Sequence, residues 1–404
     1  MSVPFQLSNQ MPLEIDTQSA QASSKNVVTP IRTFTSYNFD KNILTPASAF
    51  RFTAPGVDKS LRLAIRSCDL VTIWAVDSTG NKQPIGTGII DETDTHVTPN
   101  SVDYLLTGRD MLGQLVDNAA VDAQNRIVPV DNVGIKTIVS SLIANTRIPP
   151  GFFMQQVPNG RFLFQTAPNE TKINALQRYL EFTNCLVWTN PQGQVIVGKP
   201  DFTQNSSGYL KISSTNPAAN NCLEARVRRS TNHAIRQIVV QQQKFDLVNP
   251  LPFTLYNNDP DVQAVAASKG GRSVYTTFTY GGDGTDAVNQ LKGVGNQGGT
   301  PNAMGAQLAA RQLAKENVNI LDIEIVVQGH MNENDNAYDI DQIYNVQIDD
   351  ENVSEDMYVY ACSYELTIEH GMLTRLKLCR LGTLTAYADS LRRQNPNSTS
   401  TVVS

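Results

Sequence analysis

The stretch from Thr107 to Ala120 constrains the fold most, because the spacing of apolar residues changes there from strand-like to helical. Asp110 lies near the start of a helix predicted over 109–121, where a carboxylate favours the helix dipole. Asp117 lies seven residues further along the same predicted face. The sequence therefore predicts that one structural unit ends and another begins here. The apolar residues at helical steps are Leu112, Leu115, Val116 and Ala119.

Residues 29–106, before this boundary, have the pattern of a β unit. Apolar and polar residues alternate in several short runs, and the turn signal Ser78–Asn81 separates two of them. In the second run, Val71, Ile73 and Ala75 share one face. The strand candidates are Leu61–Ile65, Asp69–Val76, Pro84–Ile90 and His96–Leu106.

Residues 107–200 predict a small α/β unit. Beyond 109–121, helical spacing returns over 134–145 and over 170–184, and Asn169 is the candidate N-cap of the last helix. A turn at Asn190–Gly193 separates two strands that are expected to pair. The strand candidates of this unit are Phe162–Gln165, Cys185–Trp188 and Gln194–Gly198.

Residues 201–385 return to a β pattern, and Gly371 marks the turn of a long closing hairpin. A polar, Gly-rich insertion at 246–304 interrupts this unit, and a short helix is expected over 305–317. No sequence repeat relates the two β units. The strand candidates are Ala225–Arg229, Ile235–Gln242, Ile320–Val327, Ile343–Asp349, Met357–Ile368 and Leu373–Cys379. The polar residues 1–28 predict a flexible arm, and 386–404 predict a disordered tail.

Composition excludes several classes of function. The chain has 404 residues and a net charge of -6, so it lacks the overall positive charge typical of proteins that bind nucleic acids in general. Neither a signal peptide nor an apolar run of the ~20 residues that a membrane helix needs is present, so we expect cytoplasmic synthesis and no membrane insertion. The cysteines are isolated in the sequence and form no CxxC pair, so we expect buried free thiols rather than a zinc site. They are Cys68, Cys185, Cys222, Cys362 and Cys379.

Two glycine-rich motifs carry little functional weight. Gly293–Gly298 matches GxGxxG but follows a polar loop, and Pro301 delays the helix that a dinucleotide site requires. Gly281–Asp286 matches one calcium β-roll repeat, and such repeats bind calcium only when they are stacked. We interpret both as loops.

Two charged clusters are also best explained as surface features. Asn332–Asp356 contains nine acidic residues and no Lys or Arg. It predicts a solvated acidic edge, with docking to a basic partner or repulsion of DNA from a tube lumen as alternative uses. Asp335, Asp339 and Asp341 lack the order of ligands of an EF-hand. The second cluster predicts salt bridges across a subunit contact or a solvated face; it comprises Arg226, Arg228, Arg229, His233 and Arg236.

No catalytic signature is present. The four histidines are scattered, and HExxH, GxSxG, Walker A and HxE…CxxC patterns are missing. We therefore assign no catalytic, cofactor-binding or metal-binding residue and expect no cofactor. A carboxylate dyad is defined by separation in space, so the sequence leaves a glycosidase-type pair open.

The ordered motifs resemble the baseplate hub proteins of contractile-tailed phages, the Mu-type hub, late control protein D and VgrG-hub-like family. Gly108-Arg109 opening a helix with Leu115-Val116-Asp117 resembles the family's junction before its α/β domain. Further similar stretches are Cys185–Trp188 with Gly193, Val195–Val197 and Pro200; Ala306, Ala310 and Arg311 before Gly329; Tyr344–Asp349; and Gly371–Leu378. The similarity spans roughly 30–385 in order of elements, and the insertion 246–304 departs from it.

The resemblance implies a mainly β fold with two tube-like β-barrel domains and a small α/β domain. The expected domains are an arm 1–28, a first barrel 29–106, an α/β domain 107–200, a second barrel 201–385 and a tail 386–404. The family implies a homotrimer. Two similar barrels per subunit would make a threefold ring pseudo-sixfold, which would join a sixfold tail tube to a threefold spike.

This reading predicts a structural, non-enzymatic hub in the virion tail baseplate, assembled in the host cytoplasm. Its expected partners are the central spike protein, the tail tube or tube-initiator protein, the tape measure protein and baseplate wedge proteins, with a channel for DNA or tape measure but no sequence-specific nucleic-acid contact. A tail-associated cell-wall hydrolase and a VgrG-like secretion-spike hub are the alternatives. For the latter, the β-prism expected after the hub is missing from these 404 residues.

Overall fold

The structure of the chain is a computed structural model. The structure describes residues 13–18, 28–32, 34–76, 79–121, 130–149, 151–155, 157, 162–167, 169–183, 185–230, 235–243, 253–256, 272–279, 316–367 and 369–384.

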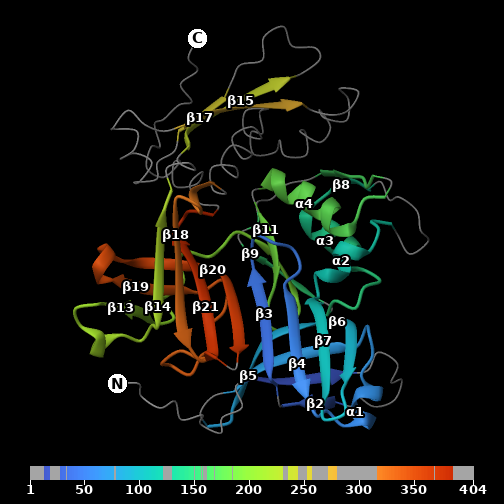
Figure 1. The fold of residues 1–404 in the computed structure, drawn as a ribbon. Helices are drawn as coiled ribbons and strands as arrows, with labels where there is room; N and C mark the ends of the chain where they lie inside the picture. Colours follow the sequence, from blue (N-terminus) through green and yellow to red (C-terminus); the bar gives the residue numbers. More distant parts are fainter. Residues whose placement is uncertain are drawn as a thin grey trace.

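A single sheet of 13 strands dominates the described structure (Figure 1). Its first unit contains β1 (Leu13–Gln18), β2 (Val28–Ile31), β3 (Ser36–Asn42), β4 (Ala49–Pro55), β5 (Leu70–Val76), β6 (Lys82–Val97) and β7 (Val102–Asp110). Its second unit contains β13 (Tyr209–Ile212), β14 (Glu224–Arg229), β18 (Leu321–Gln328), β19 (Ile343–Ile348), β20 (Val353–Thr367) and β21 (Gly371–Arg380).

The two units repeat the same strand order. The first runs β3-β4-β7-β6-β5 and the second β14-β18-β21-β20-β19, and every neighbouring pair is antiparallel. The long hairpins β6–β7 and β20–β21 even carry a bulge at the same place, between Ile90 and Glu92 and between Val359 and Ala361. The chain therefore contains a structural repeat.

The units join edge to edge, because β20 pairs with β3 in antiparallel register from Ala361 opposite Asn42 to Leu366 opposite Tyr37. In Figure 1 the strands of the two units lie side by side on either side of this seam. Asn221, just before β14, closes the second unit: its amide and side chain hydrogen-bond to the backbone of Tyr209 and Lys211 on β13.

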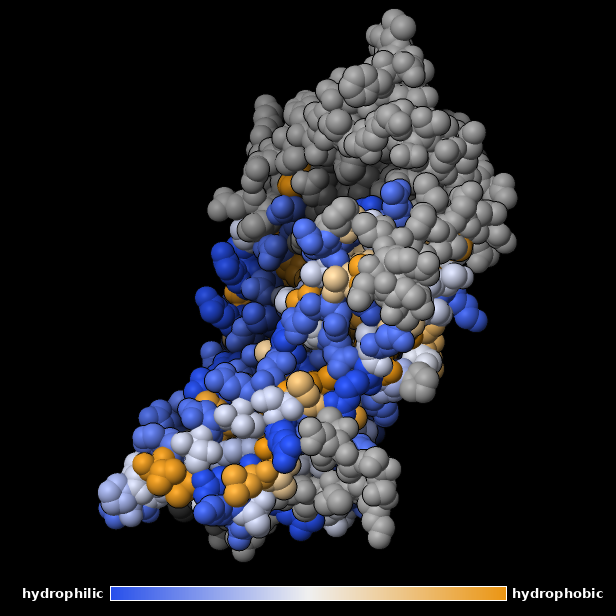
Figure 2. Space-filling model, turned by 90° about the vertical axis from the view of Figure 1, so that its right-hand side faces the viewer, coloured by the Kyte–Doolittle hydropathy of each residue, from blue (hydrophilic) through white to orange (hydrophobic). Residues whose placement is uncertain are grey.

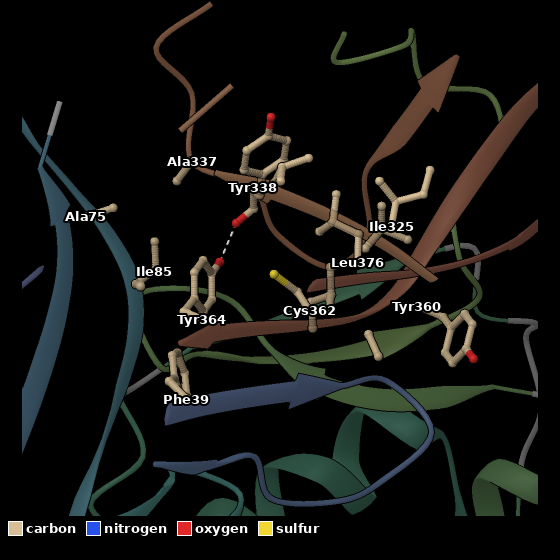
Figure 3. Packing of buried hydrophobic residues seen from close by; sticks show 14 of the residues in the cluster. Phe39, Ala75, Ile85, Ile325, Ala337, Tyr338, Tyr360, Cys362, Tyr364 and Leu376 are labelled. Carbon is tan, nitrogen blue, oxygen red and sulfur yellow. Dashed lines mark hydrogen bonds between the residues drawn. The ribbon is translucent and has the colours of Figure 1, made fainter. Parts of the chain in front are cut away.

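One hydrophobic core extends through both units. Phe39 and Phe50 of the first unit belong to the same buried cluster as Ile323, Tyr364 and Leu376 of the second. The strands supply this core by alternation, as in β5, where Val71, Ile73 and Ala75 are buried and their neighbours are not. Figure 3 shows this packing from close by.

The α/β unit has its own core and lies above the first unit in Figure 1. Its helices are α2 (Gly113–Asp117), α3 (Ile135–Ile143) and α4 (Lys172–Thr183). Its strands are β8 (Val130–Val133), β9 (Phe152–Gln155), β10 (Phe162–Phe164), β11 (Leu186–Thr189) and β12 (Val195–Gly198). The predicted mainly β fold with an α/β unit is confirmed, whereas the domain limits 29–106, 107–200 and 201–385 stay predictions.

A further sheet contains β15 (Ile235–Gln243), β16 (Phe253–Tyr256) and β17 (Arg272–Thr279). β16 and β17 lie within the predicted insertion 246–304, so this segment contains strands that its polar composition did not indicate. Most of the predicted helix 305–317, and the tail 386–404, lie outside the described residues.

Part of the predicted flexible arm 1–28 is ordered as a strand. β1 pairs along its whole length with β5. Ile15 is fully buried there, and Glu14 forms an ion pair with Lys82 at 2.5 Å. The prediction of a flexible arm is therefore wrong for 13–18, because a strand edge on β5 accepts these residues.

The strand predicted at Leu61–Ile65 is wrong, because Lys59–Ala64 forms the helix α1. The Asp58 carboxylate accepts hydrogen bonds from the backbone amide and the hydroxyl of Ser60, both at 2.7 Å, as an N-terminal helix cap does. Leu63 is 67% exposed, so the apparent alternation does not mark one buried sheet face.

The prediction of a helix over 109–121 is also wrong about where the helix begins and ends. β7 continues to Asp110, with Arg109 paired to Ala49 on one side and to Ile89 on the other. The turn follows at Met111, and α2 covers Gly113–Asp117. Asp110 and Asp117 consequently do not share a helix face, since Asp110 belongs to the strand.

The N-cap predicted at Asn169 is wrong by two residues. Asn169 has a φ of 61°, outside the helix, and the Thr171 hydroxyl accepts a hydrogen bond from the amide of Asn174 at 3.3 Å. The predicted strands at Cys185–Trp188 and Gln194–Gly198 do pair, as β11 and β12.

Candidate functional site

The seam between the two units is stabilised by aromatic packing and a buried hydrogen bond. The rings of Phe39 on β3 and Tyr364 on β20 stack with centroids 5.8 Å apart and planes 15° apart. The Tyr364 hydroxyl donates to the backbone carbonyl of Tyr338, as the dashed line in Figure 3 shows. Since both partners are buried, this bond fixes the segment between β18 and β19 against the seam.

A buried ion pair crosses the same seam. Lys41 on β3 has a side chain only 2% exposed and pairs with the Asp339 carboxylate, which is 14% exposed. Its ammonium group also donates to the carbonyl of Ile85 at 2.8 Å. Burial raises the pKa of Asp339, and the charge and hydrogen bond of Lys41 oppose that rise. Lys41 therefore connects β3, β6 and the segment before β19.

A third contact is a buried hydrogen-bond chain from Tyr37 to Gly329. The Thr374 hydroxyl donates its one proton to the Gly329 carbonyl at 2.6 Å, so it accepts from Nδ1 of His330 at 2.8 Å. Nε2 of His330 then accepts from the Tyr37 hydroxyl at 2.5 Å. Burial lowers the pKa of His330 to about 3, opposed by the Gly329 backbone, so the ring is neutral.

The face of the sheet opposite the core carries charged residues of alternating sign. Across β14, β18 and β21, Arg226 stands opposite Glu324 and Glu324 opposite Lys377. Arg375 on β21 lies between Glu365, at 3.0 Å, and Glu324, at 3.5 Å. A groove of about 340 Å³ lies over the seam on this face. The groove is polar, and its charges largely compensate one another.

The stretch Gly108-Arg109-Asp110, at the boundary predicted from the sequence, connects β6, β7 and α2. A Cβ at Gly108 would lie 2.2 Å from the Ile89 carbonyl oxygen, so glycine allows β7 to approach β6. The Arg109 guanidinium binds Asp91 of β6 at 2.7 Å and Asp117 of α2 at 2.6 Å. The hydrogen bonds to both carboxylates raise the pKa of Arg109, and those from Arg109 lower the pKa of Asp117.

Asp110 anchors the α/β unit to the first β unit. Its buried carboxylate accepts from the amide of Leu112 at 3.0 Å and from the hydroxyl of Thr189 on β11 at 3.1 Å. Burial raises the pKa of Asp110, while the hydrogen bonds oppose the rise. Gly108, Arg109 and Asp110 thus form a structural junction of β6, β7, α2 and β11.

The predicted solvated acidic edge, 332–356, is wrong in part. Asp339 pairs with Lys41, and the Asp341 carboxylate accepts from the Tyr358 hydroxyl at 2.7 Å. Burial raises the pKa of Asp341 to about 6 despite this bond. Glu351 pairs with Arg229, and Glu355 with Arg380 at 3.0 Å. Within the described ranges, no group of three or more His, Cys, Asp or Glu side chains is arranged to hold a metal ion.

The arginine cluster is resolved at β14. Arg226, Arg228 and Arg229 are exposed, with Arg226 and Arg228 opposite Glu324 and Asp322 of β18. These positions agree with the predicted alternation, and Arg229 pairs with Glu351 of the same chain. Salt bridges of this cluster across a subunit contact stay a prediction. His233 lies outside the described residues, as do the loops Gly281–Asp286 and Gly293–Gly298.

The five cysteines are free, and all but Cys68 are buried. Burial raises the pKa of Cys222 to about 12, so its thiol is protonated at neutral pH. Among the described helices, none is long and apolar enough to cross a membrane.

Sequence reasoning missed the seam residues. Lys41 continues the alternation of the buried Tyr37 and Phe39 on β3, so a charged residue at a core position was visible in the sequence. Its partner Asp339 lies 298 residues away, and nothing local identifies it.

Comparison with known proteins identifies the fold. No protein-family model and no curated protein matches the chain. The solved tail protein from Neisseria meningitidis MC58 matches with a TM-score of 0.69 and 18% identity, over 93% of this chain and 99% of that one. The 43 kDa tail protein of prophage MuSo2 from Shewanella oneidensis matches with a TM-score of 0.65 and 14% identity, over 92% and 99%.

A third similar structure comes from a secretion system. The E. coli c3393 protein, described as a type VI secretion component with structural similarity to T4 bacteriophage tail proteins gp27 and gp5, matches with a TM-score of 0.51 and 7% identity. The match covers 86% of this chain and 73% of that chain. At these identities the likeness concerns the fold, and the chain has the fold of phage tail proteins.

Proposed function

We propose that the protein is the structural baseplate hub of a contractile phage tail. In this role a homotrimer joins the sixfold tail tube to the threefold central spike. The single observation that carries the proposal is the structural repeat: one chain holds two β units with the same strand order, joined edge to edge. Three copies would present six similar units on one ring and keep threefold symmetry elsewhere.

The strand count supports a channel along the ring axis. Each chain contributes the continuous row β14-β18-β21-β20-β3-β4-β7-β6. Three such rows would form a closed barrel larger than the porin barrels of about 16–18 strands, which already enclose an aqueous channel. The polar, charge-compensated face described above would line it and hold neither DNA nor a tape measure protein tightly.

The proposal assigns no catalytic step to the protein. Its partners are the spike, the tail tube or tube-initiator protein, the tape measure protein and baseplate wedge proteins. It is located in the virion tail baseplate after assembly in the host cytoplasm, without membrane insertion or sequence-specific DNA binding.

Mass photometry of the purified protein, with and without a spike protein from the same phage, tests the proposal. We expect trimers and a complex of three hub copies with one spike. A strict monomer at micromolar concentration that has no affinity for the spike would refute it. Detection of peptidoglycan turnover, abolished by one Asp or Glu substitution, would replace it with the hydrolase alternative.

The likeness to the type VI secretion component favours one second candidate, the hub of a secretion spike. The two candidates share the ring and differ in the assembly that contains it. Cryo-electron microscopy of particles from the producing cells separates them, because a hub in a tail attached to a capsid excludes the secretion role.

A further inference from the structure

The repeat identifies an unused strand edge on β6. In the second unit, one edge of β20 pairs first with β19, over Val353–Tyr358, and then with β3, over Ala361–Leu366. Its counterpart β6 pairs with β5 over Lys82–Ile89. Beyond the bulge at Asp91, no strand in the described part of the chain continues along that edge of β6.

The matching unused edge is on β14. In the repeat, β14 is the counterpart of β3. β14 pairs with β18 in the second unit, just as β3 pairs with β4 in the first. β3 uses its second edge to pair with β20, whereas β14 pairs on that side with none of the described strands. β6 and β14 lie at opposite ends of the row of strands, as Figure 1 shows, so one copy does not bring them together.

We propose that β6 of one copy pairs with β14 of a second copy of this chain, as β20 pairs with β3 within one copy. The inference deepens the proposed function, because it names the contact that would continue the sheet around the homotrimer. The contact is heterologous: each copy offers β6 to one neighbour and β14 to the other, which is the arrangement that closes into rings.

The repeat also gives the register. Aligning the bulges of the long hairpins places Thr95 at the position of Tyr364. Aligning β14–β18 with β3–β4 places Val227 at the position of Phe39. Because Tyr364 pairs with Phe39, Thr95 pairs with Val227 of the partner subunit. Asp94 then stands opposite Arg228 of the partner subunit in antiparallel register.

Charge complementarity supports this pairing. The β6 segment carries Asp91, Glu92 and Asp94. Glu92 and Asp94 are exposed, and neither forms an ion pair with a cation of the described residues. β14 carries Arg226, Arg228 and Arg229, also exposed. Opposite charges facing each other across antiparallel strands contribute about 0.2–1 kcal/mol per pair. Pairing of β6 with β6 of another copy, or of β14 with β14, would instead place like charges opposite each other and is disfavoured.

Two exposed apolar side chains point to the same contact. Val97 at the end of β6 is 65% exposed, and Leu223 just before β14 is 54% exposed. In the proposed register Val97 faces Ala225, two residues from Leu223 of the partner subunit, which is a diagonal neighbour. On the described surface seen from the side of the first unit, hydrophilic residues predominate and hydrophobic groups are small (Figure 2). Backbone pairing and charge suit such a surface better than a broad apolar interface does.

Disulfide trapping tests the register directly. In a Cys68→Ser background, one protein carries Asp94→Cys and a second carries Arg228→Cys, and the two are mixed and oxidised. We expect a covalent dimer in the mixture, because directly opposite residues have Cβ atoms about 4.5–5.5 Å apart. Directly opposite residues alternate along antiparallel strands between hydrogen-bonded and non-hydrogen-bonded pairs. The flanking pair Thr93→Cys with Arg229→Cys therefore tests the other of these two geometries. The mismatched pair Asp94→Cys with Val227→Cys, whose side chains lie on opposite faces, is the control and should give at least about tenfold less dimer.

Charge reversal provides an independent readout. Arg228→Glu should raise the concentration at which the trimer dissociates by about tenfold or more, and adding Asp94→Arg to the same chain should restore most of the affinity. A trimer that neither cross-links at these pairs nor responds to Arg228→Glu would overturn the register and leave the hub proposal standing. A protein that stays monomeric and binds no spike would overturn the hub proposal itself, and trapping of the pairs without a closed trimer would support the strand contact alone.

Discussion

Replacing Lys41 by Met tests whether the buried ion pair holds the two β units together. The substitution retains much of the side-chain volume and removes the ammonium group, which leaves the buried Asp339 carboxylate without its partner. Removing one member of a buried pair costs about 3–5 kcal/mol. We expect Lys41→Met to reduce the free energy of unfolding by this amount at pH 8.

The charge on Asp339 accounts for most of that loss, so removing it should recover stability. In the double variant Lys41→Met with Asp339→Asn, the Ile85 carbonyl still lacks its donor, a deficit of about 1–3 kcal/mol. The single variant should also recover as the pH falls. Burial already raises the folded-state pKa of Asp339 above its unfolded value, and losing Lys41 raises it further. The folded variant therefore binds a proton before the unfolded chain does, which stabilises it at lower pH.

Urea unfolding followed by tryptophan fluorescence at pH 8 and pH 5 measures these differences, with Trp188 in the shared core as one reporter. Lys136→Met on the exposed face of α3 is the control and should stay within about 0.5 kcal/mol of the parent. A loss below about 1 kcal/mol for Lys41→Met would refute the reasoning, and so would a double variant that loses the sum of the two single losses.

The remaining predictions concern the other anchors. The folded pKa of His330, about 3, lies below the unfolded value, so acid should cost about 1.4 kcal/mol per pH unit between about pH 6.5 and 3; unfolding curves of His330→Gln should lack that slope, and an unchanged slope would contradict a neutral buried ring. Asp110→Ala should cost about 1.5–3 kcal/mol in thermal unfolding because two buried hydrogen bonds to its carboxylate are lost; a shift in melting temperature no larger than that of Lys136→Met would disagree. Arg109→Lys should cost about 1 kcal/mol, with a smaller deficit in ~1 M salt; a salt-independent loss would point to packing instead.

Local patterns in the sequence predicted most strands of the large sheet. The run Val71, Ile73 and Ala75 is buried as alternation predicted, and Gly371, with a φ of 70°, turns the closing hairpin. The same reasoning failed at Leu61–Ile65, where Asp58 starts a helix, and at Arg109, which the sheet holds in β7. In both cases a contact outside the apolar pattern decided the backbone conformation.

The sequence alone determined the mainly β fold class and the order β, α/β, β, because these depend on periodicity and turn residues within short windows. The domain boundary near Gly108 stays a prediction. Only the tertiary structure revealed the repeat, the seam of β20 on β3 and the pairs Lys41–Asp339 and Tyr37–His330. Those features join residues about 300 positions apart. A one-dimensional pattern contains no information on which distant edge a strand will meet, so strand pairing and buried charge compensation emerge only when the whole sheet is assembled.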